Sequence, residues 1–118
     1  MTTGIKHDLG KPEFNLIPPR AELAMASVLT FGAAKYAPDN WKLVDNAETR
    51  YLAAAMRHLN AYRAGEVYDR ESGLQHLAHA MTCLAFLIEL SPVSLVDTMA
   101  SNSVSNSATS LATSLATS

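Results

Sequence analysis

The chain has 118 residues and a mass of 12.7 kDa, which is enough for one small domain and too little for two. The sum of 9 Lys and Arg against 11 Asp and Glu gives a net charge of −2. This charge argues against a protein that binds DNA or RNA, because neutralising phosphates needs clustered excess cations. A single cysteine, Cys83, excludes an internal disulfide and a zinc site built from cysteine pairs. No apolar run is long enough for a membrane helix, and no signal peptide is recognisable, so we expect a cytoplasmic protein without membrane contact.

Residues 91–118 differ in composition from the rest of the chain. They contain one charged side chain, Asp97, and 13 Ser or Thr residues, and residues 108–118 repeat with a period of four. Such a segment cannot bury enough apolar surface to offset the entropy of ordering it, so we predict a disordered tail. A weak helix with a leucine stripe is the alternative. The working domain is then residues 1–90, and so small a core often needs a partner subunit.

An extended arm with turns is expected over residues 1–17, which contain several Gly and Pro residues. Pro19 suits the first position of a helix, since its φ angle is already helical. Gly32 is expected to end that helix. Residues 33–44 read as a loop or broken helix around Trp41.

A second helix is expected from Thr49 to Ala64. Asp45 with Glu48 three residues later fits a capping box, and Gly65 provides a stop. At 100° per residue, one side of this helix is apolar, and it consists of Leu52, Ala55, Met56, Leu59 and Tyr62. A separate stripe places two arginines over small residues, and it consists of Arg50, Ala54, Arg57 and Ala61.

A third helix is expected to start at a second capping box, Ser72 with Gln75, and to run to Leu90 before Ser91 and Pro92. It is apolar almost all round, as in a helix that is buried on several sides. Three helices of one chain can hardly cover it. No segment alternates with a period of two, so we predict an all-α fold: a small bundle of three main helices, completed by a second subunit.

Two histidines, His76 and His79, interrupt the third helix and lie on the same side of it. The second helix adds His58, and the two helices are expected to pack as a hairpin. Neutral imidazoles at this spacing are typical ligands of a transition metal, and buried polar contacts between helices are the alternative. A zinc site of His76, His79 and Cys83 is disfavoured, because three ligands on one helix face give poor tetrahedral geometry.

The connection before the third helix is acidic, with Glu66, Asp69 and Glu71 in one turn. Carboxylate oxygens are the ligands that Mg²⁺ prefers. The alternative explanation is that acids are favoured near the N-terminus of the third helix by the helix dipole, which accounts for one acid well and for three less well. We therefore expect Glu71, with Asp69, to share one wet cavity between subunits with the histidines.

Basic and aromatic residues upstream suit a phosphorylated ligand. The planar fork of arginine binds phosphate with two hydrogen bonds, although a solvated helix face is the alternative reading of these cations. Trp41 or Tyr36 suits stacking on a base, and packing of the bundle is the commoner use of such residues. The expected ligand contacts are Lys11, Lys35, Asn40, Trp41, Arg50 and Arg57.

Several short motifs stand in order between about residues 5 and 90. They are Asp8-Leu-Gly-Lys11-Pro, Leu16-Ile-Pro-Pro19, Phe31-Gly-Ala-Ala-Lys35-Tyr36, Asn40-Trp41, Arg57-His58-Leu59, Gly65-Glu66, Asp69 and Glu71-Ser-Gly-Leu-Gln-His76-Leu-Ala-His79-Ala80. With these motifs the chain resembles the phage and bacterial family described as the dATP/dGTP diphosphohydrolase N-terminal domain.

The resemblance implies a MazG-like all-α nucleotide pyrophosphohydrolase that cleaves a nucleoside triphosphate between the α- and β-phosphates. It further implies a homo-oligomer, dimer or tetramer, and a divalent metal, Mg²⁺ or Mn²⁺ with Co²⁺ as a further candidate. If the chain is phage-encoded, it would act in the host cytoplasm on the nucleotide pool. The expected metal ligands are Asp69, Glu71, His76 and His79, and the expected catalytic residues are Glu71, His79 and His58.

One departure from the MazG-like pattern keeps a second hypothesis open. Those enzymes are expected to hold their metals with a Glu-x-x-Glu and a Glu-x-x-Asp pair on successive helices, whereas no acid stands between Thr49 and Ala64 or between Ser72 and Ile88. Either the metal site is rebuilt from the acidic turn and the histidines, or the chain is a non-catalytic oligomeric module. Such a module would bind a nucleotide or a phage or host protein.

Overall fold

The computed structural model describes residues 3–92, so almost all of the predicted tail lies outside the described residues. Within that range the chain is all-α, as predicted, and its extended pairing is limited to one isolated bridge between Tyr68 and Gln75. The elements in order are a 3-10 turn η1 (Phe14–Leu16), α1 (Pro19–Lys35), a 3-10 turn η2 (Asn40–Leu43), α2 (Ala47–Arg63) and α3 (His76–Leu90).

Helix α1 begins at Pro19, as predicted, and its end differs from the prediction. The helix continues through Gly32 to Lys35. Gly32 keeps a negative φ, and two alanines follow it, so the cost of about 1 kcal/mol for a glycine inside a helix does not break the helix. The extension matters because it carries the amine of Lys35 one turn further along the helix.

Both predicted capping boxes are wrong. Helix α2 starts after Asn46, which has a left-handed φ of 53° and makes no capping hydrogen bond through its side chain. Helix α3 starts after Gln75, because Ser72 is occupied in the preceding turn rather than at the helix N-terminus. The stop at Gly65 is confirmed: this residue follows the last turn of α2 with a φ of +103°, which only glycine adopts readily.

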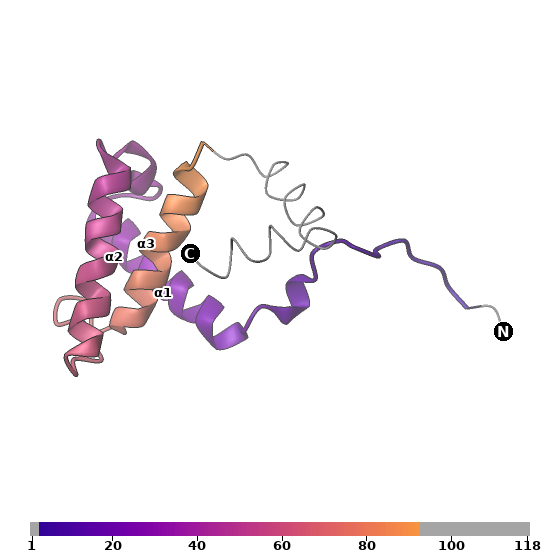
Figure 1. The fold of residues 1–118 in the computed structure, drawn as a ribbon, viewed down its shortest axis with the longest axis horizontal. Coiled ribbons are helices and arrows are strands. Elements are labelled where there is room, and N and C mark those ends of the chain that lie inside the picture. Colours follow the sequence, from indigo (N-terminus) through magenta and orange to yellow (C-terminus); the bar gives the residue numbers. More distant parts are fainter. Residues whose placement is uncertain (1–2, 93–118) are drawn as a thin grey trace, which may run out of the picture.

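Helices α2 and α3 lie side by side as the predicted hairpin, and α1 packs mainly against α3 (Figure 1). The close approach is possible because small side chains face inward, with Ala55 on α2 and Ala78 and Ala80 on α3 almost fully buried. The N-terminal arm runs away from the bundle as an extended segment (Figure 1). In the described part of the chain, no helix is long and apolar enough to cross a membrane.

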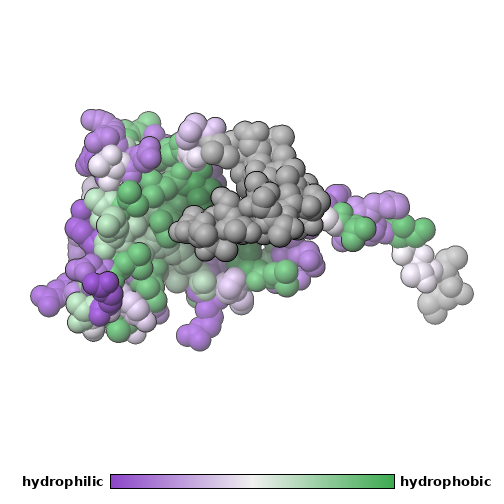
Figure 2. Space-filling model, viewed as in Figure 1, coloured by the Kyte–Doolittle hydropathy of each residue, from purple (hydrophilic) through white to green (hydrophobic). Residues whose placement is uncertain are grey.

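The apolar side predicted for α2 faces outward for most of its length. Leu52, Met56 and Leu59 are between 44% and 60% exposed, whereas Ala55 from the same side is buried against α3. Figure 2 shows apolar surface gathered over the part of the molecule formed by α2 and α3. A contiguous apolar surface of this kind is typical of an interaction site.

Candidate functional site

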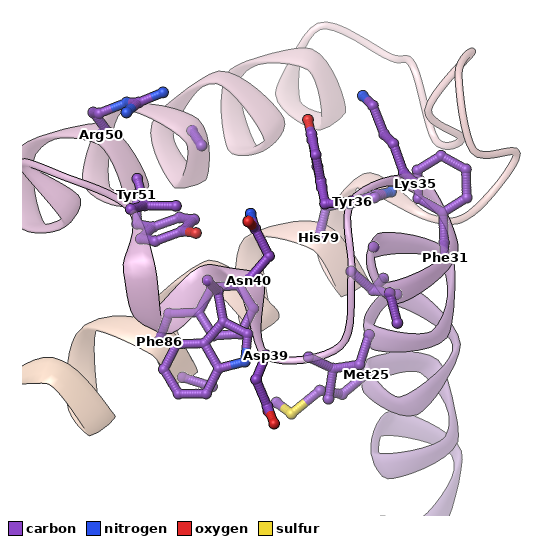
Figure 3. A pocket seen from close by; sticks show the side chains of 18 of the residues that line it. Met25, Phe31, Lys35, Tyr36, Asp39, Asn40, Arg50, Tyr51, His79 and Phe86 are labelled. Atoms are coloured by element: carbon purple, nitrogen blue, oxygen red, sulfur yellow. The ribbon is translucent and has the colours of Figure 1, made fainter.

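A cavity of about 1150 Å³ opens between the three helices and the loop that joins α1 to α2. Glu71 and His79 both line it, so the acidic turn and the histidine helix converge on one hollow, as predicted. The prediction placed this hollow between subunits, whereas the cavity is lined by residues of one chain. Figure 3 shows Tyr51 and Phe86 on one side of the cavity and Lys35 on the other, with Asn40 between them. The two sides differ in chemistry, and we call them the aromatic end and the histidine end.

The histidine end is built where α2 lies against α3. Nδ1 of His58 and Nδ1 of His76 are 2.8 Å apart, and the ring of His58 stacks on that of His79 with centroids 4.6 Å apart. His76 is only 5% exposed. The hairpin therefore brings all three predicted histidines into one cluster. His58 lies on the face of α2 that contacts α3, and His76 and His79 lie on the face of α3 that contacts α2.

The turn before α3 adds a carboxylate–serine–histidine chain. Oδ2 of Asp69 accepts hydrogen bonds from the backbone N–H and the hydroxyl of Ser72, at 2.9 and 3.0 Å. Nε2 of His79 lies 2.7 Å from the same hydroxyl oxygen, which also accepts the backbone N–H of Leu74 at 3.1 Å. Since the one hydroxyl proton goes to Asp69, Nε2 of His79 must be the donor, and its Nδ1 keeps a free lone pair.

Ser72 is the residue that sequence reasoning placed wrongly, as a helix cap. The spacing of Ser72 from its neighbours could have indicated this role. Asp69, three residues earlier, is typical of a turn closed by side-chain hydrogen bonds, and His79 lies about two helical turns later. Gly73, with a φ of +73°, allows the chain to fold back so that Ser72 faces α3. The hydroxyl links the acidic turn to the histidine helix.

Burial and neighbouring charge set the protonation of this cluster. Desolvation lowers the pKa of His58, and the nearby histidines lower it further. Desolvation also lowers the pKa of His79, although the Asp69 carboxylate opposes the shift. For Asp69, desolvation alone would raise the pKa, but the two hydrogen bonds from Ser72 outweigh it and the net pKa is lowered. At neutral pH the two histidines are therefore neutral and Asp69 is ionised.

The predicted ligand Glu71 does not join the histidines. Its carboxylate is paired with the amine of Lys35, and both side chains are exposed at the rim of the cavity. This pairing follows from the extra turn of α1, which brings Lys35 to Glu71, and the hydrogen bond raises the pKa of Lys35. The group whose ligand atoms do lie together, within 4.8 Å of one another, is His58, Asp69 and His76.

The aromatic end is formed by the loop between α1 and α2 lying on α3. Trp41 stacks on Phe86 with ring centroids 4.5 Å apart and planes 11° apart, and Tyr51 meets the same ring edge-on at 5.0 Å. Sequence reasoning singled out Trp41 but missed Tyr51 and Phe86, which in the sequence are indistinguishable from core residues. Asn40 lines the cavity beside them.

The predicted phosphate contacts divide into two groups. Lys35, Arg50 and Arg57 line the cavity. Lys11 is not among the lining residues and lies in the exposed N-terminal arm, where its N–H bonds the carbonyl of Asp8. The structure does not bring Lys11 to the site, because the arm before Pro19 extends away from the bundle (Figure 1).

Comparisons with known proteins agree on one family. A family model described as dATP/dGTP diphosphohydrolase, N-terminal, matches residues 1–94. A protein named dATP/dGTP diphosphohydrolase, from Salmonella phage PMBT28, is 40% identical over 88 residues, which cover 75% of this chain and 30% of that protein. This chain thus spans less than a third of the length of that relative. No solved structure matches the chain.

Proposed function

The chain belongs to the family described as dATP/dGTP diphosphohydrolase, N-terminal, and from this membership we propose that it hydrolyses a purine deoxynucleoside triphosphate to the monophosphate and pyrophosphate. One observation carries the proposal: a single cavity joins an aromatic wall to a carboxylate–serine–histidine chain. A nucleotide needs these two environments at once. The cavity volume also suffices, since small-molecule sites commonly measure about 300–1,000 Å³.

The base is proposed to bind at the aromatic end. Trp41 and Phe86 are stacked face to face, so a base can extend the stack on its outer face, and Tyr51 meets the ring of Phe86 edge-on. Stacking on these rings is favourable for any base and greatest for the large purine ring. The amide of Asn40 offers both a donor and an acceptor to the edge of the base.

The triphosphate is proposed to lie toward Lys35 and Arg57, which line the same cavity, whereas Arg50 lines it on the side of Tyr51, opposite Lys35 (Figure 3). In the free chain the amine of Lys35 is held by Glu71 at the rim. A phosphate oxygen offers that amine a second acceptor, so Glu71 positions Lys35 until substrate arrives. The guanidinium group of Arg57 is proposed to neutralise phosphate charge with two parallel hydrogen bonds.

The chemistry is assigned to His79. Its Nδ1 accepts a proton from the water that attacks the α-phosphorus, the bond from that phosphorus to the bridging oxygen breaks, and pyrophosphate leaves with the electron pair. Asp69 stabilises the resulting imidazolium through the hydroxyl of Ser72. A divalent cation, when bound, neutralises phosphate charge and lowers the pKa of water, and the donor atoms of His58, Asp69 and His76 fit one.

The test is product identity. The chain is incubated with dGTP or dATP and Mn²⁺, Mg²⁺ or Co²⁺, and the products are separated by anion exchange. The proposal expects dGMP or dAMP with pyrophosphate in equal amounts. A diphosphate with inorganic phosphate, or no turnover with any of the three metals, would contradict it.

A non-catalytic nucleotide-binding module is the second candidate, and the acid distribution favours it. Within the described residues, α2 carries one acid, Glu48 in its first turn, and α3 carries one, Glu89 near its end. Neither helix therefore presents a pair of acids to the cavity. Thermal melting with dGTP separates the two candidates: stabilisation that is the same with and without metal, together with no turnover, supports the module.

A second copy of the chain is proposed to cover the apolar side of α2. Leu52, Met56 and Leu59 share this side with Glu48 near the N-terminus and Arg63 at the C-terminus of the helix. If two copies pair α2 with α2 in antiparallel fashion, each Glu48 meets an Arg63 and the leucines face each other, which makes the surface self-complementary. Sedimentation equilibrium tests this: the proposal expects an oligomer that Met56→Lys dissociates, and a wild-type monomer would contradict it.

A further inference from the structure

The cluster at the core of the histidine end is richer in nitrogen than a magnesium site. It offers two imidazoles and one carboxylate, His58, His76 and Asp69, from three different parts of the chain. Imidazole nitrogen suits Fe²⁺, Co²⁺, Ni²⁺ and Zn²⁺, Mn²⁺ also takes carboxylate oxygen, and Mg²⁺ keeps to oxygen ligands and several waters. This set of ligand atoms therefore disfavours Mg²⁺, the ion that the paired acids of MazG-like enzymes would favour.

The distances between the ligand atoms of His58, Asp69 and His76 match those of ligands that share one metal ion. Metal–nitrogen bonds measure about 2.0–2.1 Å, so two neighbouring ligand nitrogens lie about 2.9 Å apart at a right angle and about 3.4 Å apart in a tetrahedron. The two Nδ1 atoms of His58 and His76 are 2.8 Å apart. All three ligand atoms lie within 4.8 Å of one another, and ligands on opposite sides of one ion lie about 4.2 Å apart, so small side-chain rotations close the site.

The far side of His76 provides an independent observation. Its Nε2 is buried and makes no hydrogen bond, and the nearest carboxylate oxygen, Oε2 of Glu66, is 3.5 Å away. When Nδ1 binds a metal, the proton must sit on Nε2, where this carboxylate faces it. A histidine held between a metal and a carboxylate is the usual outer arrangement of transition-metal sites, because the carboxylate fixes the tautomer and makes the imidazole more basic.

We propose that His58, Asp69 and His76 bind one transition-metal ion per chain, of the Mn²⁺, Co²⁺ or Zn²⁺ class, in preference to Mg²⁺. Glu66 is a positioning residue that acts through His76. Binding replaces the hydrogen bond between the two Nδ1 atoms, and the proton of that bond moves to the Nε2 atom of the ring that carried it. The catalytic meaning of this site rests on the proposed function, whereas metal binding itself does not.

The experiment is a titration of the full chain with Co²⁺, followed by visible absorption, at constant pH. We expect one Co²⁺ per chain, with bands from nitrogen and oxygen ligands that 10 mM Mg²⁺ leaves unchanged. His58→Gln and Asp69→Asn should each weaken Co²⁺ binding by at least about tenfold. His7→Gln is the matched control, because His7 lies in the exposed arm and should not affect binding. His76→Gln is a third ligand variant and should weaken Co²⁺ binding in the same way. Circular dichroism shows whether each variant is folded. If His76→Gln does not fold, His58→Gln and Asp69→Asn test the site without it.

Glu66 is tested in the same titration. Glu66→Ala should weaken Co²⁺ binding about tenfold, and Glu66→Gln should restore most of it because the amide oxygen still accepts the proton of Nε2. Arg70→Ala is the control, since it removes the other partner of Glu66 without touching the cluster. An equal loss in Glu66→Gln and Glu66→Ala would overturn the positioning role.

Two outcomes separate this inference from the proposed function. Unchanged Co²⁺ binding in His58→Gln and Asp69→Asn, or displacement of Co²⁺ by 10 mM Mg²⁺, overturns the metal site even if dGTP is hydrolysed. Co²⁺ binding that these two variants abolish supports the metal site, even if the chain hydrolyses neither dGTP nor dATP.

Discussion

The two ends of the cavity are held together in different ways. At the histidine end, hydrogen bonds of 2.7–3.1 Å tie Asp69, Ser72, His79 and the backbone of Leu74 into one connected chain. At the aromatic end, ring contacts place Trp41 and Tyr51 against Phe86. Hydrogen bonds are directional and fix the atoms of a group, whereas ring contacts tolerate small displacements. The first arrangement suits chemistry at a defined atom, and the second suits binding of a flat ligand.

Removing the imidazole of His79 is expected to have the largest effect on activity. His79→Ala should lower kcat for dGTP by about 100-fold or more, with little change in KM, because a general base acts in the transition state. Initial rates of pyrophosphate release measure this, with His7→Gln as the control. A kcat within a factor of three of wild type would remove His79 from the mechanism.

Removing the indole of Trp41 should change binding rather than chemistry. Loss of one stacking partner costs about 1–3 kcal/mol of binding free energy, so Trp41→Ala should raise KM or the Kd of dGTP by about 5- to 150-fold while kcat changes little. Trp41→Phe keeps a flat ring and should restore most of the affinity. Loss of kcat without loss of affinity would mean that the two ends do not divide their roles in this way.

Ser72 connects the turn to α3, and its loss should appear in stability. Ser72→Ala removes the acceptor of the Leu74 N–H and one donor to Asp69, which should lower the free energy of unfolding by about 1–2 kcal/mol. Urea denaturation measures this, and Ser27→Ala on α1 is the matched control, since its hydroxyl only bonds a carbonyl in its own helix. Equal losses in the two variants would contradict a special role for the turn.

The smallest expected effect is the change of the free energy of unfolding with pH. Burial lowers the pKa of His58 and His79, so the unfolded chain, with histidine pKa values near 6.5, binds more protons than the folded chain as the pH falls. Stability should therefore change little between about pH 7 and pH 8 and decrease as the pH falls through about 6.5. Urea midpoints at pH 8.0 and 5.5 test this, and the slope should be shallower in His58→Gln and unchanged in His7→Gln. A urea midpoint that rises toward pH 5.5 would contradict the assignment of His58 and His79 as neutral, partly buried imidazoles.

The parts of this fold that could be predicted from sequence are those that local chemistry dictates. Pro19 and Gly65 mark a helix start and a helix stop because their backbone preferences do not depend on the rest of the molecule. The spacing of His76 and His79 likewise places them on one side of any helix. These local signals were enough to predict three helices and the approach of the acidic turn to the histidine helix, although not that the cavity lies within one chain.

The parts that sequence missed depend on contacts between distant residues. Gly32 does not end α1, and the pairing of Lys35 with Glu71 that results joins positions 36 residues apart. Ser72 has the spacing of a helix cap, but tertiary packing gives its hydroxyl to His79 instead. The aromatic end has no local signal at all, because Phe86 becomes a wall of the cavity only when the loop with Trp41 lies on it.

The most direct test of the account is a crystal structure of the chain soaked with Mn²⁺ and a deoxyguanosine triphosphate analogue that cannot be cleaved between its α- and β-phosphates. Anomalous scattering locates the ion without reference to the ligand. The account predicts Mn²⁺ among His58, Asp69 and His76, the α-phosphate near His79 and the guanine at Trp41. Manganese bound by other residues, with the nucleotide outside this cavity, would contradict it.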